Sequence, residues 1–271
     1  MPSYVVIGAS RGIGYQFLKT LSADPKNTVI GTARNTSATE TQLATDKIKN
    51  VPIVAAEMDS PTSMAAAAAA VAKITPSVDY LIVNGGYISD VSAFLAPSQF
   101  IGQESFFAEE FQKSMATNAA GVLYTINAFL PLVRAGNVKK VVVLGSGLGD
   151  YDSTFKWDIE FGVPYSMSKA AVNLLIAKYG AELKGEGFTF LSLSPGMVMT
   201  RAEDVNNREL LPSYVQQAVN VLTAKFQKGY PDFKGPISPA ESVDMCLKVI
   251  DQVTPKESGA FLSHHGNKKW L

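Results

Sequence analysis

A tyrosine and a lysine stand four positions apart in the stretch VPYSMSKAAVNLLIAKYGAEL, which has the spacing of a long amphipathic helix. Residues four apart lie on one face of a helix, with Cβ atoms about 5–6 Å from each other. We therefore expect the phenol of Tyr165 to lie beside the amine of Lys169. A phenol can donate a proton to a developing alkoxide, and a neighbouring cation favours the phenolate that takes the proton back. The pair predicts acid–base chemistry on an oxygen.

Two other tyrosines precede a lysine by four positions, so the spacing needs support from its context. Tyr15 lies in a helix that leads away from a glycine-rich turn, and Tyr230 is followed by a proline, which forbids ordinary helical spacing. Only Tyr165 follows a predicted strand that ends in a serine, VVVLGSG. Ser146 is therefore the candidate for a second hydrogen-bond donor to the same oxygen. The alternative is that this serine caps a turn.

The stretch GASRGIG, just after the apolar run YVVI, carries three glycines in seven residues. Gly8 ends the first predicted strand, Gly12 sits in the turn, and Gly14 falls inside the following helix. Glycines let a pyrophosphate approach the main chain, and a helix N-terminus offers free N–H groups and a partial positive charge. The turn predicts a dinucleotide site, because ligands of open parallel sheets bind at the carboxyl ends of the strands. A plain tight turn is the alternative.

A basic residue follows the second predicted strand, where the adenosine ribose of a dinucleotide would lie. An acidic residue there would accept a hydrogen bond from the ribose 2′-hydroxyl of NAD. Arg34, with Arg11 from the glycine turn, can instead neutralise the 2′-phosphate of NADP. We therefore predict NADP(H) as the cofactor, with a solvated surface arginine as the alternative for Arg34. Asp59, after the third predicted strand, is a candidate partner for the adenine amino group, or else it begins a turn.

Short β-branched runs alternate with longer helical stretches along the chain. The runs are apolar almost throughout, as expected for parallel strands that helices cover on both faces. The pattern predicts one α/β domain over residues 1–271, a doubly wound parallel sheet of about seven strands with helices on both faces. Six of the strands are assigned from the sequence to YVVI, NTVIGT, VPIVAA, DYLIVN, KKVVVLGS and FTFLSLS.

One long stretch, residues 200–239, interrupts the alternation and carries the aromatic residues Tyr214, Phe226, Tyr230 and Phe233. We interpret it as an insertion that covers the substrate site. Aromatic and sulfur-containing side chains elsewhere are candidates to face it, and these are Tyr87, Phe155, Trp157, Met197 and Met199. Their chemistry predicts an apolar or aromatic substrate, with burial in the core as the alternative.

The composition narrows the class of protein and its location. Among 271 residues, 24 basic side chains balance 24 acidic ones, so no overall field attracts nucleic acid or an anionic membrane. Cys246 is the only cysteine, and His264 and His265 have no third ligand nearby, so we predict no disulfide and no metal site. No apolar run approaches about 20 residues, and the strand-like start leaves no room for an export signal. We expect a cytoplasmic protein whose partners are a small-molecule substrate and copies of itself.

Together these motifs resemble the short-chain dehydrogenase/reductase family. The following motifs occur in the same order as in that family, over nearly the whole chain: GASRGIG, VNGG, Asn118, Ser146, Tyr165-x-x-x-Lys169 and SPGMVMT. The ending GAFLSHHGNKKW is also similar to the endings of the carbonyl-reductase-like branch. Because of this likeness, we expect a Rossmann-type fold.

The chain departs from the family's usual pattern at three places. Ile7 stands where a threonine is usual, and Gly86 stands where an alanine is more common. Ser146 precedes Tyr165 by 19 positions, several more than usual. The first two departures concern packing, and the third is expected to reshape the substrate pocket.

The resemblance also implies a role for each motif. Tyr165 and Ser146 would act on the reacting oxygen, while Lys169 would also bind the nicotinamide ribose. Asn118 would hold a water that links Lys169 to solvent, and the turn at Pro195 would face the nicotinamide carboxamide. The full set of candidate cofactor-binding residues is Gly8, Ser10, Arg11, Gly12, Ile13, Gly14, Arg34, Asp59, Asn84, Gly85, Tyr165, Lys169, Pro195, Val198 and Thr200. Pairing through the helices that contain Asn118 and Tyr165 implies a homodimer or homotetramer.

Three functions are consistent with these residues. The first is an NADP-dependent oxidoreductase that transfers a hydride between the nicotinamide and a carbonyl or secondary alcohol of a small hydrophobic molecule. The second is a scaffold that has become a non-redox catalyst, such as a cyclase, dehydratase or isomerase, and the third is a protein that senses NADP(H). The intact set of Ser146, Tyr165 and Lys169 favours the first, because loss of a reacting group is the usual sign of such a change.

Overall fold

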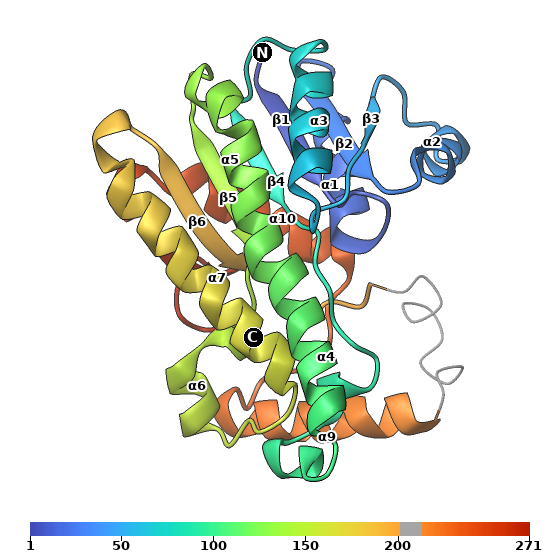
Figure 1. Cartoon of the computed structure of the whole chain (residues 1–271), viewed down its shortest axis with the longest axis vertical. Helices are drawn as coiled ribbons and strands as arrows, with labels where there is room; N and C mark the ends of the chain where they lie inside the picture. The colour runs from blue at the N-terminus through green and yellow to red at the C-terminus, as the bar shows by residue number, and fades with distance from the viewer. Residues whose placement is uncertain (201–212) are drawn as a thin grey trace.

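In the part of the chain that the structure describes, seven short apolar runs form one parallel sheet in the order β3-β2-β1-β4-β5-β6-β7 (Figure 1). The structure is a computed structural model that describes residues 1–200 and 213–271, with the backbone alone for 213–219. The strands are β1 (Ser3–Ile7), β2 (Thr28–Ala33), β3 (Ile53–Ala55), β4 (Tyr80–Val83), β5 (Lys140–Leu144), β6 (Thr189–Ser194) and β7 (Ala260–Ser263). The predicted doubly wound parallel sheet is confirmed. Its order reverses between β1 and β4, the switch point at which open α/β sheets bind ligands.

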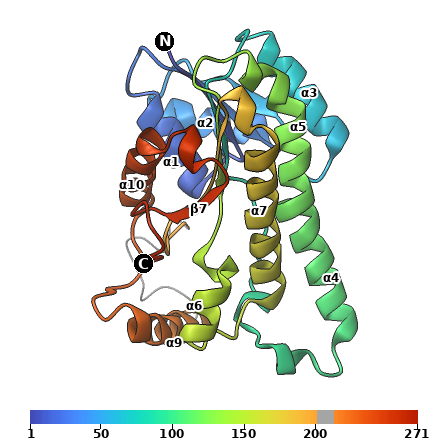
Figure 2. The ribbon, with the colours of Figure 1, turned by 90° about the vertical axis from the view of Figure 1, so that its left-hand side faces the viewer.

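Helices connect the strands and cover both faces of the sheet (Figures 1 and 2). The longer ones are α1 (Gly12–Leu21), α2 (Thr36–Thr45), α3 (Pro61–Ala72), α4 (Glu104–Met115), α5 (Gly121–Arg134), α6 (Tyr151–Lys156), α7 (Val163–Glu182), α9 (Ser213–Gly229) and α10 (Pro239–Gln252). Short turns of helix are η1 (Ser92–Phe94), η2 (Pro97–Phe100), η3 (Ala116–Ala120), η4 (Gly147–Gly149), η5 (Lys184–Glu186) and η7 (Pro255–Glu257). Helices α3, α5 and α7 pack on one face, and α1 and α10 pack on the other.

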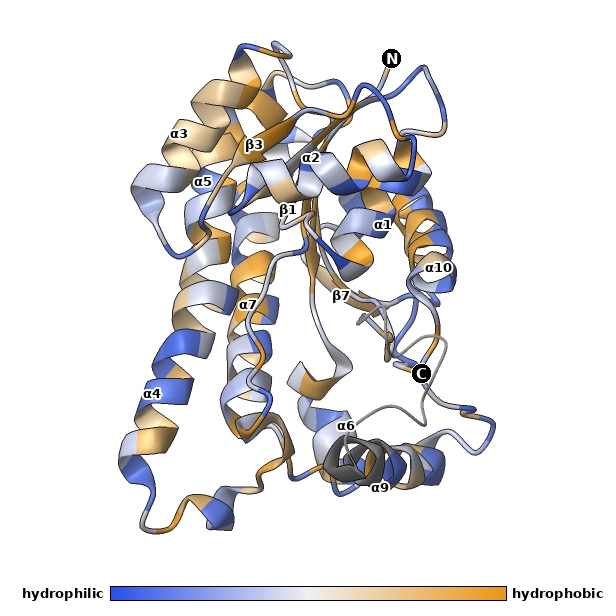
Figure 3. Cartoon of the chain, turned by 90° about the vertical axis from the view of Figure 1, so that its right-hand side faces the viewer, coloured by the Kyte–Doolittle hydropathy of each residue, from blue (hydrophilic) through white to orange (hydrophobic). Residues whose placement is uncertain are grey.

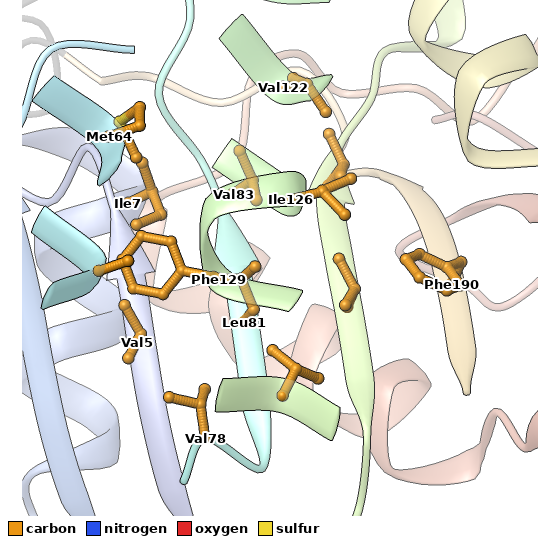
Figure 4. Packing of buried hydrophobic residues seen from close by; sticks show 14 of the residues in the cluster. Val5, Ile7, Met64, Val78, Leu81, Val83, Val122, Ile126, Phe129 and Phe190 are labelled. Carbon is orange, nitrogen blue, oxygen red and sulfur yellow. The ribbon is translucent and has the colours of Figure 1, made fainter. Parts of the chain in front are cut away.

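The core explains why the strand ends lie at fixed positions. Alternate residues of β1 point to opposite faces, so Val5 and Ile7 pack with Phe129 of α5 and Met64 of α3, whereas Val6 packs beneath α1 and α10 (Figure 4). A slip of one residue would exchange these two sets. The register therefore determines which residues emerge at the carboxyl edge of the sheet.

The seventh strand comes from the tail of the chain, where the sequence patterns assigned no strand. Residues Ala260–Ser263 pair in parallel with β6 and form an edge of the sheet. The run is only four residues long, too short to stand out by periodicity. Its position places the residues after Ser263 at the carboxyl edge, next to the loop that leaves β6.

Helices α4 and α5 join through the π-helical turn η3 into one helix, Glu104–Arg134 (Figure 2). By length and composition alone this helix could cross a membrane, although no uninterrupted apolar run of that length occurs. Its inner side belongs to the core of the domain, where Val122, Ile126 and Phe129 are fully buried. Figure 3 shows hydrophilic residues along α4, the part that extends beyond the sheet.

Candidate active site

The loop after β5 and the start of α7 bring Ser146 and Tyr165 together. Helix α7 begins after Gly162, which has a φ of 69°, and Pro164 lies in its first turn. Proline suits this position because its fixed φ matches the helix and its missing N–H has no partner there. Ser146 lies near enough to the phenol of Tyr165 to act on it: the serine side chain lowers the pKa of the phenol, against the larger opposite effect of burial. Two segments that are 19 positions apart in sequence thus place two hydroxyl groups at one point.

Ser146 also caps the short helix η4, as the alternative interpretation expects. Its Oγ accepts a hydrogen bond from the backbone N–H of Leu148, at 3.2 Å. A hydroxyl can accept and donate at once, so the cap leaves the hydrogen of Ser146 available to a second oxygen. The two interpretations of this residue are therefore compatible.

Lys169 lies beside the ring of Tyr165 and not at its hydroxyl. Its Nζ is 5.6 Å from the ring centroid and donates a 2.7 Å hydrogen bond to the carbonyl oxygen of Leu144. Burial lowers the pKa of the Lys169 amine to about 8, and burial raises the pKa of the Tyr165 phenol to about 12. Burial dominates both pKa values, and no attraction between the two groups contributes to either. The expectation that Lys169 favours the phenolate stays a prediction.

Asn118 connects the loop after β4 to α7. It lies in the π-helical turn η3, where its Oδ1 accepts from the backbone N–H of Tyr87 at 2.7 Å and its Nδ2 donates to the carbonyl oxygen of Tyr87 at 2.8 Å. The same Nδ2 donates to Oγ of Ser168, at 2.9 Å, and Ser168 in turn donates to the carbonyl oxygen of Tyr165. Asn118 is thus a buried amide that makes three hydrogen bonds and links the loop after β4 to the first residues of α7. Its role in a water relay stays a prediction.

Gly86 leaves room between two of these groups. A Cβ built on it would lie 3.2 Å from Oδ1 of Asn118 and 3.8 Å from Nζ of Lys169. The residue at which the chain departs from the family's usual alanine therefore borders the amine itself. Its packing role, expected from the sequence, lies within the candidate active site.

The glycine-rich turn after β1 is closely packed against the loop after β4. A Cβ on Gly14 would lie 2.3 Å from the carbonyl oxygen of Gly8, and a Cβ on Gly8 would lie 2.5 Å from Cα of Gly85. Nδ2 of Asn84 donates a 2.7 Å hydrogen bond to the same oxygen of Gly8. Only glycine fits at these places, so the two loops meet backbone to backbone at the switch point of the sheet.

The N-terminus of α1 has the features of an anion site. Gly12 has a φ of 57°, and Arg11 at the N-cap makes no capping hydrogen bond with its side chain. The first turn contains no acidic residue, so its N–H groups and the positive end of the helix dipole face the turn unopposed. Ser10 is exposed, and Ile13 is partly buried against the core. The turn therefore fits the pyrophosphate of a dinucleotide, and a Cβ added to Gly12 would occupy part of the space in the turn.

Arg34 follows β2 directly and is exposed, as is Arg11. The preceding strand is tied to the glycine turn, because the backbone N–H of Gly8 donates to Oγ1 of Thr32 at 3.1 Å. Toward the described residues, neither arginine makes a hydrogen bond or an ion pair. Both guanidinium groups are thus placed to meet an added phosphate. Asp59 is exposed just before α3, and neither interpretation of it is tested.

The segment after β6 closes the other side of this site. The carbonyl oxygen of Pro195 accepts a 2.8 Å hydrogen bond from Ser242 of α10, and Val198 pairs with Ile237 in an isolated bridge. Thr200 reaches the glycine turn, with its Cβ 3.1 Å from where a Cβ on Gly12 would lie. Two ends of the predicted cofactor site, distant in sequence, are therefore in contact.

The predicted insertion at 200–239 contains α9, while residues 201–212 and the side chain of Tyr214 lie outside the described residues. Phe226 and Phe233 pack together with Phe161, and Tyr230 contacts Trp157 at 4.8 Å between ring centroids. These contacts place α9 against the segment that follows α6, which supplies the extra residues between Ser146 and Tyr165.

The aromatic and sulfur-containing residues that are candidates to face the insertion differ in their surroundings. Trp157 and Met197 pack in the same cluster as α9, whereas Phe155 is 79% exposed and lies outside this cluster. Whether Phe155 faces the insertion stays a prediction. Tyr87 lies near the candidate active site, and its hydroxyl donates to the buried carboxylate of Glu110 at 3.0 Å. Hydrogen bonds hold the pKa of Glu110 below its usual value despite its burial, which itself acts to raise that pKa.

Two tail residues, which the sequence patterns did not assign to the site, touch it. The ring of Trp270 packs against Gly147, next to Ser146, and its Nε1 donates to Oγ of Ser153 at 2.7 Å. The ring of His264 packs against Gly196 in the turn after Pro195, where Gly196 has a φ of 85°. A tight approach at a glycine leaves no local pattern in the sequence, so neither contact could be predicted from it.

Comparison with known proteins assigns the family. The family model for short chain dehydrogenase matches residues 3–210. A short chain dehydrogenase of Hypocrea virens is 38% identical over 276 residues, and a short-chain dehydrogenase/reductase of an Arthrinium species is 39% identical over 272 residues, each with 100% of both chains covered. The NADPH-bound carbonyl reductase from chicken fatty liver is 26% identical, with a TM-score of 0.76 over 98% of this chain and 93% of that one. This chain therefore belongs to the short-chain dehydrogenase/reductase family of oxidoreductases.

Proposed function

We propose that this protein is an NADPH-dependent reductase that converts the carbonyl group of a small hydrophobic ketone or aldehyde to an alcohol. The observation that carries the proposal is that Ser146 lies near enough to the phenol of Tyr165 to act on its pKa, with the buried amine of Lys169 beside the ring. The likeness to an NADPH-bound carbonyl reductase, at 26% identity, supports the reaction and the cofactor.

The two hydroxyl groups have distinct tasks in this reaction. A bound nicotinamide would supply the hydride, which leaves negative charge on the carbonyl oxygen of the substrate. Ser146 donates a hydrogen bond to that oxygen, and Tyr165 transfers its proton to it. A phenol of ordinary pKa is already protonated at neutral pH, and burial raises the pKa of Tyr165 further, to about 12, so the group is suited to donate. The reverse reaction needs the phenolate.

The chain offers a complete set of groups for NADP(H). The pyrophosphate fits the glycine turn and the N-terminus of α1, where a Cβ on Gly14 would collide with the backbone. Arg34 and Arg11 would neutralise the 2′-phosphate. Lys169 would hold the nicotinamide ribose through its buried amine, which lies beside Tyr165. Thr200 and Pro195 would border the nicotinamide end.

Consumption of NADPH with a panel of ketones, aldehydes and quinones tests the proposal, with NADH in parallel. Turnover with a ketone or aldehyde and a clear preference for NADPH is expected. Tight NADPH binding without turnover on any member of the panel would favour an NADP(H) sensor. Turnover of a substrate with no change in NADPH would favour a non-redox catalyst.

We further propose that the protein is a cytoplasmic homo-oligomer that pairs through α7 and the neighbouring helix α4–α5. Along α7, Met167, Ala170, Leu174, Ala177 and Ala181 are exposed at intervals of three and four residues. Such a stripe has the spacing of a helix face that packs against another helix. The balance of charges and the single cysteine are compatible with a reducing compartment.

A further inference from the structure

A cavity of about 740 Å³ lies between the tail and the loop that joins α9 to α10. Its walls come from five places in the sequence: the end of α6, the turn after β6, residues 229–237, Met245 of α10, and the tail after β7. None of the catalytic candidates Ser146, Tyr165, Lys169 or Asn118 lines it, nor does the glycine turn. The cavity is therefore separate from the groups to which the proposed reaction is assigned.

Aromatic rings form part of the wall. Trp157 and Tyr230 contact each other at 4.8 Å between ring centroids with an interplanar angle of 58°, and Phe233 follows on the same loop. Their size and flat faces suit a ring system, because offset and tilted contacts between rings are favourable. A volume of several hundred cubic ångströms is that of a small-molecule site.

Positive charge surrounds the same cavity. Lys156, Lys234, Lys268 and Lys269 line it, against a single acidic side chain, Asp232, among the described lining residues. The C-terminal residue Leu271 also lines it and adds one carboxylate. Nζ of Lys156 is 5.6 Å from the ring of Trp157, so cation and aromatic surface lie side by side. On a chain whose net charge is zero, this surplus of cations is local.

A buried histidine forms part of the wall. His264 is 5% exposed, and its ring packs against Gly196 in the turn after Pro195.

We propose that this cavity binds an organic anion that carries an aromatic ring system, of the class of an aromatic carboxylate or sulfonate. The rings would lie against Trp157 and Tyr230, and the anionic group would meet Lys268 and Lys269. The proposal does not depend on the proposed hydride transfer, because none of the catalytic candidates Ser146, Tyr165, Lys169 and Asn118 lines the cavity.

Binding of 8-anilinonaphthalene-1-sulfonate, an aromatic anion, tests this assignment on the full-length protein with saturating NADP⁺ present. The chain has two tryptophans; Trp157 lines the cavity and Trp270 adjoins Leu271, so energy transfer from tryptophan to the probe reports occupancy. The neutral N-phenyl-1-naphthylamine serves as the matched probe without the sulfonate. We expect saturable energy transfer from tryptophan to the anionic probe. The Trp157→Phe variant should lose more of this energy transfer than of the total binding of the probe.

A double substitution, Lys268→Met with Lys269→Met, should weaken binding of the anionic probe about tenfold and leave binding of the neutral probe unchanged. Methionine keeps much of the stem that packs over Phe261 and Trp270. The matched control is Lys73→Met with Lys256→Met, which removes two exposed charges outside this cavity. Equal affinities of all three proteins for the anion, or displacement of the anion by NADP⁺, would overturn the proposal.

Discussion

At the scale of single residues, the proposed reduction depends on the phenol of Tyr165 as proton donor. Tyr165→Phe removes one oxygen and leaves the ring to pack beside Lys169. We expect NADPH affinity to be retained while turnover falls by about 10²–10⁴-fold, the usual contribution of general acid catalysis. Steady-state turnover on a true substrate, together with an NADPH titration, measures both effects.

The matched control for this substitution is Tyr15→Phe, in another tyrosine–lysine pair with the same spacing. The hydroxyl of Tyr15 donates to Asp46 at 2.8 Å, so its removal costs one hydrogen bond outside the candidate active site. Turnover should stay close to that of the original protein. Near-native turnover of Tyr165→Phe would contradict the mechanism and favour a repurposed scaffold.

The proposed preference for NADP over NAD depends on the charge after β2. Arg34→Asp replaces an exposed guanidinium by a group that repels the 2′-phosphate and can accept from a ribose hydroxyl. We expect NADPH binding to weaken by roughly 1.5–3 kcal/mol, the range of a charge-assisted hydrogen bond, with NADH binding unchanged or improved. Calorimetric titration with both cofactors provides the measurement. Unchanged affinity for NADPH would remove Arg34 from the site.

Burial of Lys169 makes the stability of the fold depend on pH. The pKa of its amine is about 8 in the folded protein, against 10.5 for a solvated lysine, so the unfolded chain binds more protons between these values and the free energy of unfolding rises with pH. The cost of the buried charge is roughly 3 kcal/mol at pH 7, and about 2 kcal/mol of it is regained by pH 9.5. Tyr165 contributes little over this range, because its phenol stays protonated in the folded protein and only about a quarter of it ionises in the unfolded chain by pH 9.5.

Comparison with Lys169→Met isolates this contribution from that of other groups. Urea unfolding at pH 7 and pH 9.5 should show the original protein gaining roughly 2 kcal/mol relative to the variant as the pH rises. A constant difference between the two proteins would mean that the amine is solvated or paired in the folded state.

At the scale of elements, the site is formed where two backbone turns meet. Gly14→Ala would ordinarily favour a helix by about 1 kcal/mol, but here its Cβ would lie 2.3 Å from the carbonyl oxygen of Gly8. The turn must therefore shift, and we expect NADPH affinity to fall by at least about tenfold together with a lower melting temperature. Gly185→Ala is the control, because nothing lies within 4 Å of its Cβ position. An equal effect of both substitutions would show that the turn has room.

The sequence predicted those parts of the site that short segments determine. The glycine turn, the strand that ends near Ser146 and the start of α7 each have their own pattern of glycines, apolar runs and helical spacing. The partners of Asn118, and the packing of Trp270 on Gly147, join residues 31 to more than 100 positions apart. The π-helical turn η3 and the four-residue strand β7 also lack periodic patterns. Such features are determined by tertiary packing, which one sequence does not reveal.

The shifted pKa values of Tyr165 and Lys169 are also determined by tertiary packing. Spacing alone places an amine near a phenol and predicts mutual attraction. The fold adds desolvation of both groups and gives the amine a carbonyl partner at Leu144, 2.7 Å away. Spacing along a helix carries no information about solvent, so the sign of these shifts could not be predicted.

At the scale of the whole molecule, one side of the domain has an unpartnered apolar stripe close to the candidate active site. Helix α7 carries Tyr165 in its first turn and packs against α4 along the same side (Figure 2). On its outer face Met167 is 46% exposed and Leu174 is 62% exposed. Pairing of this face with a second copy would bury the stripe and hold the helix that positions the phenol.

Leu174→Glu tests this pairing, since it places a charge at the centre of the stripe and a buried unpaired charge opposes association. We expect a dimer or tetramer for the original protein and a monomer for the variant by sedimentation velocity at micromolar concentration. Ile74→Glu, on a residue that is 44% exposed after the end of α3, is the control and should leave the assembly unchanged. If the variant keeps the mass of the original assembly, or if the original protein is itself monomeric, the pairing through α7 is wrong.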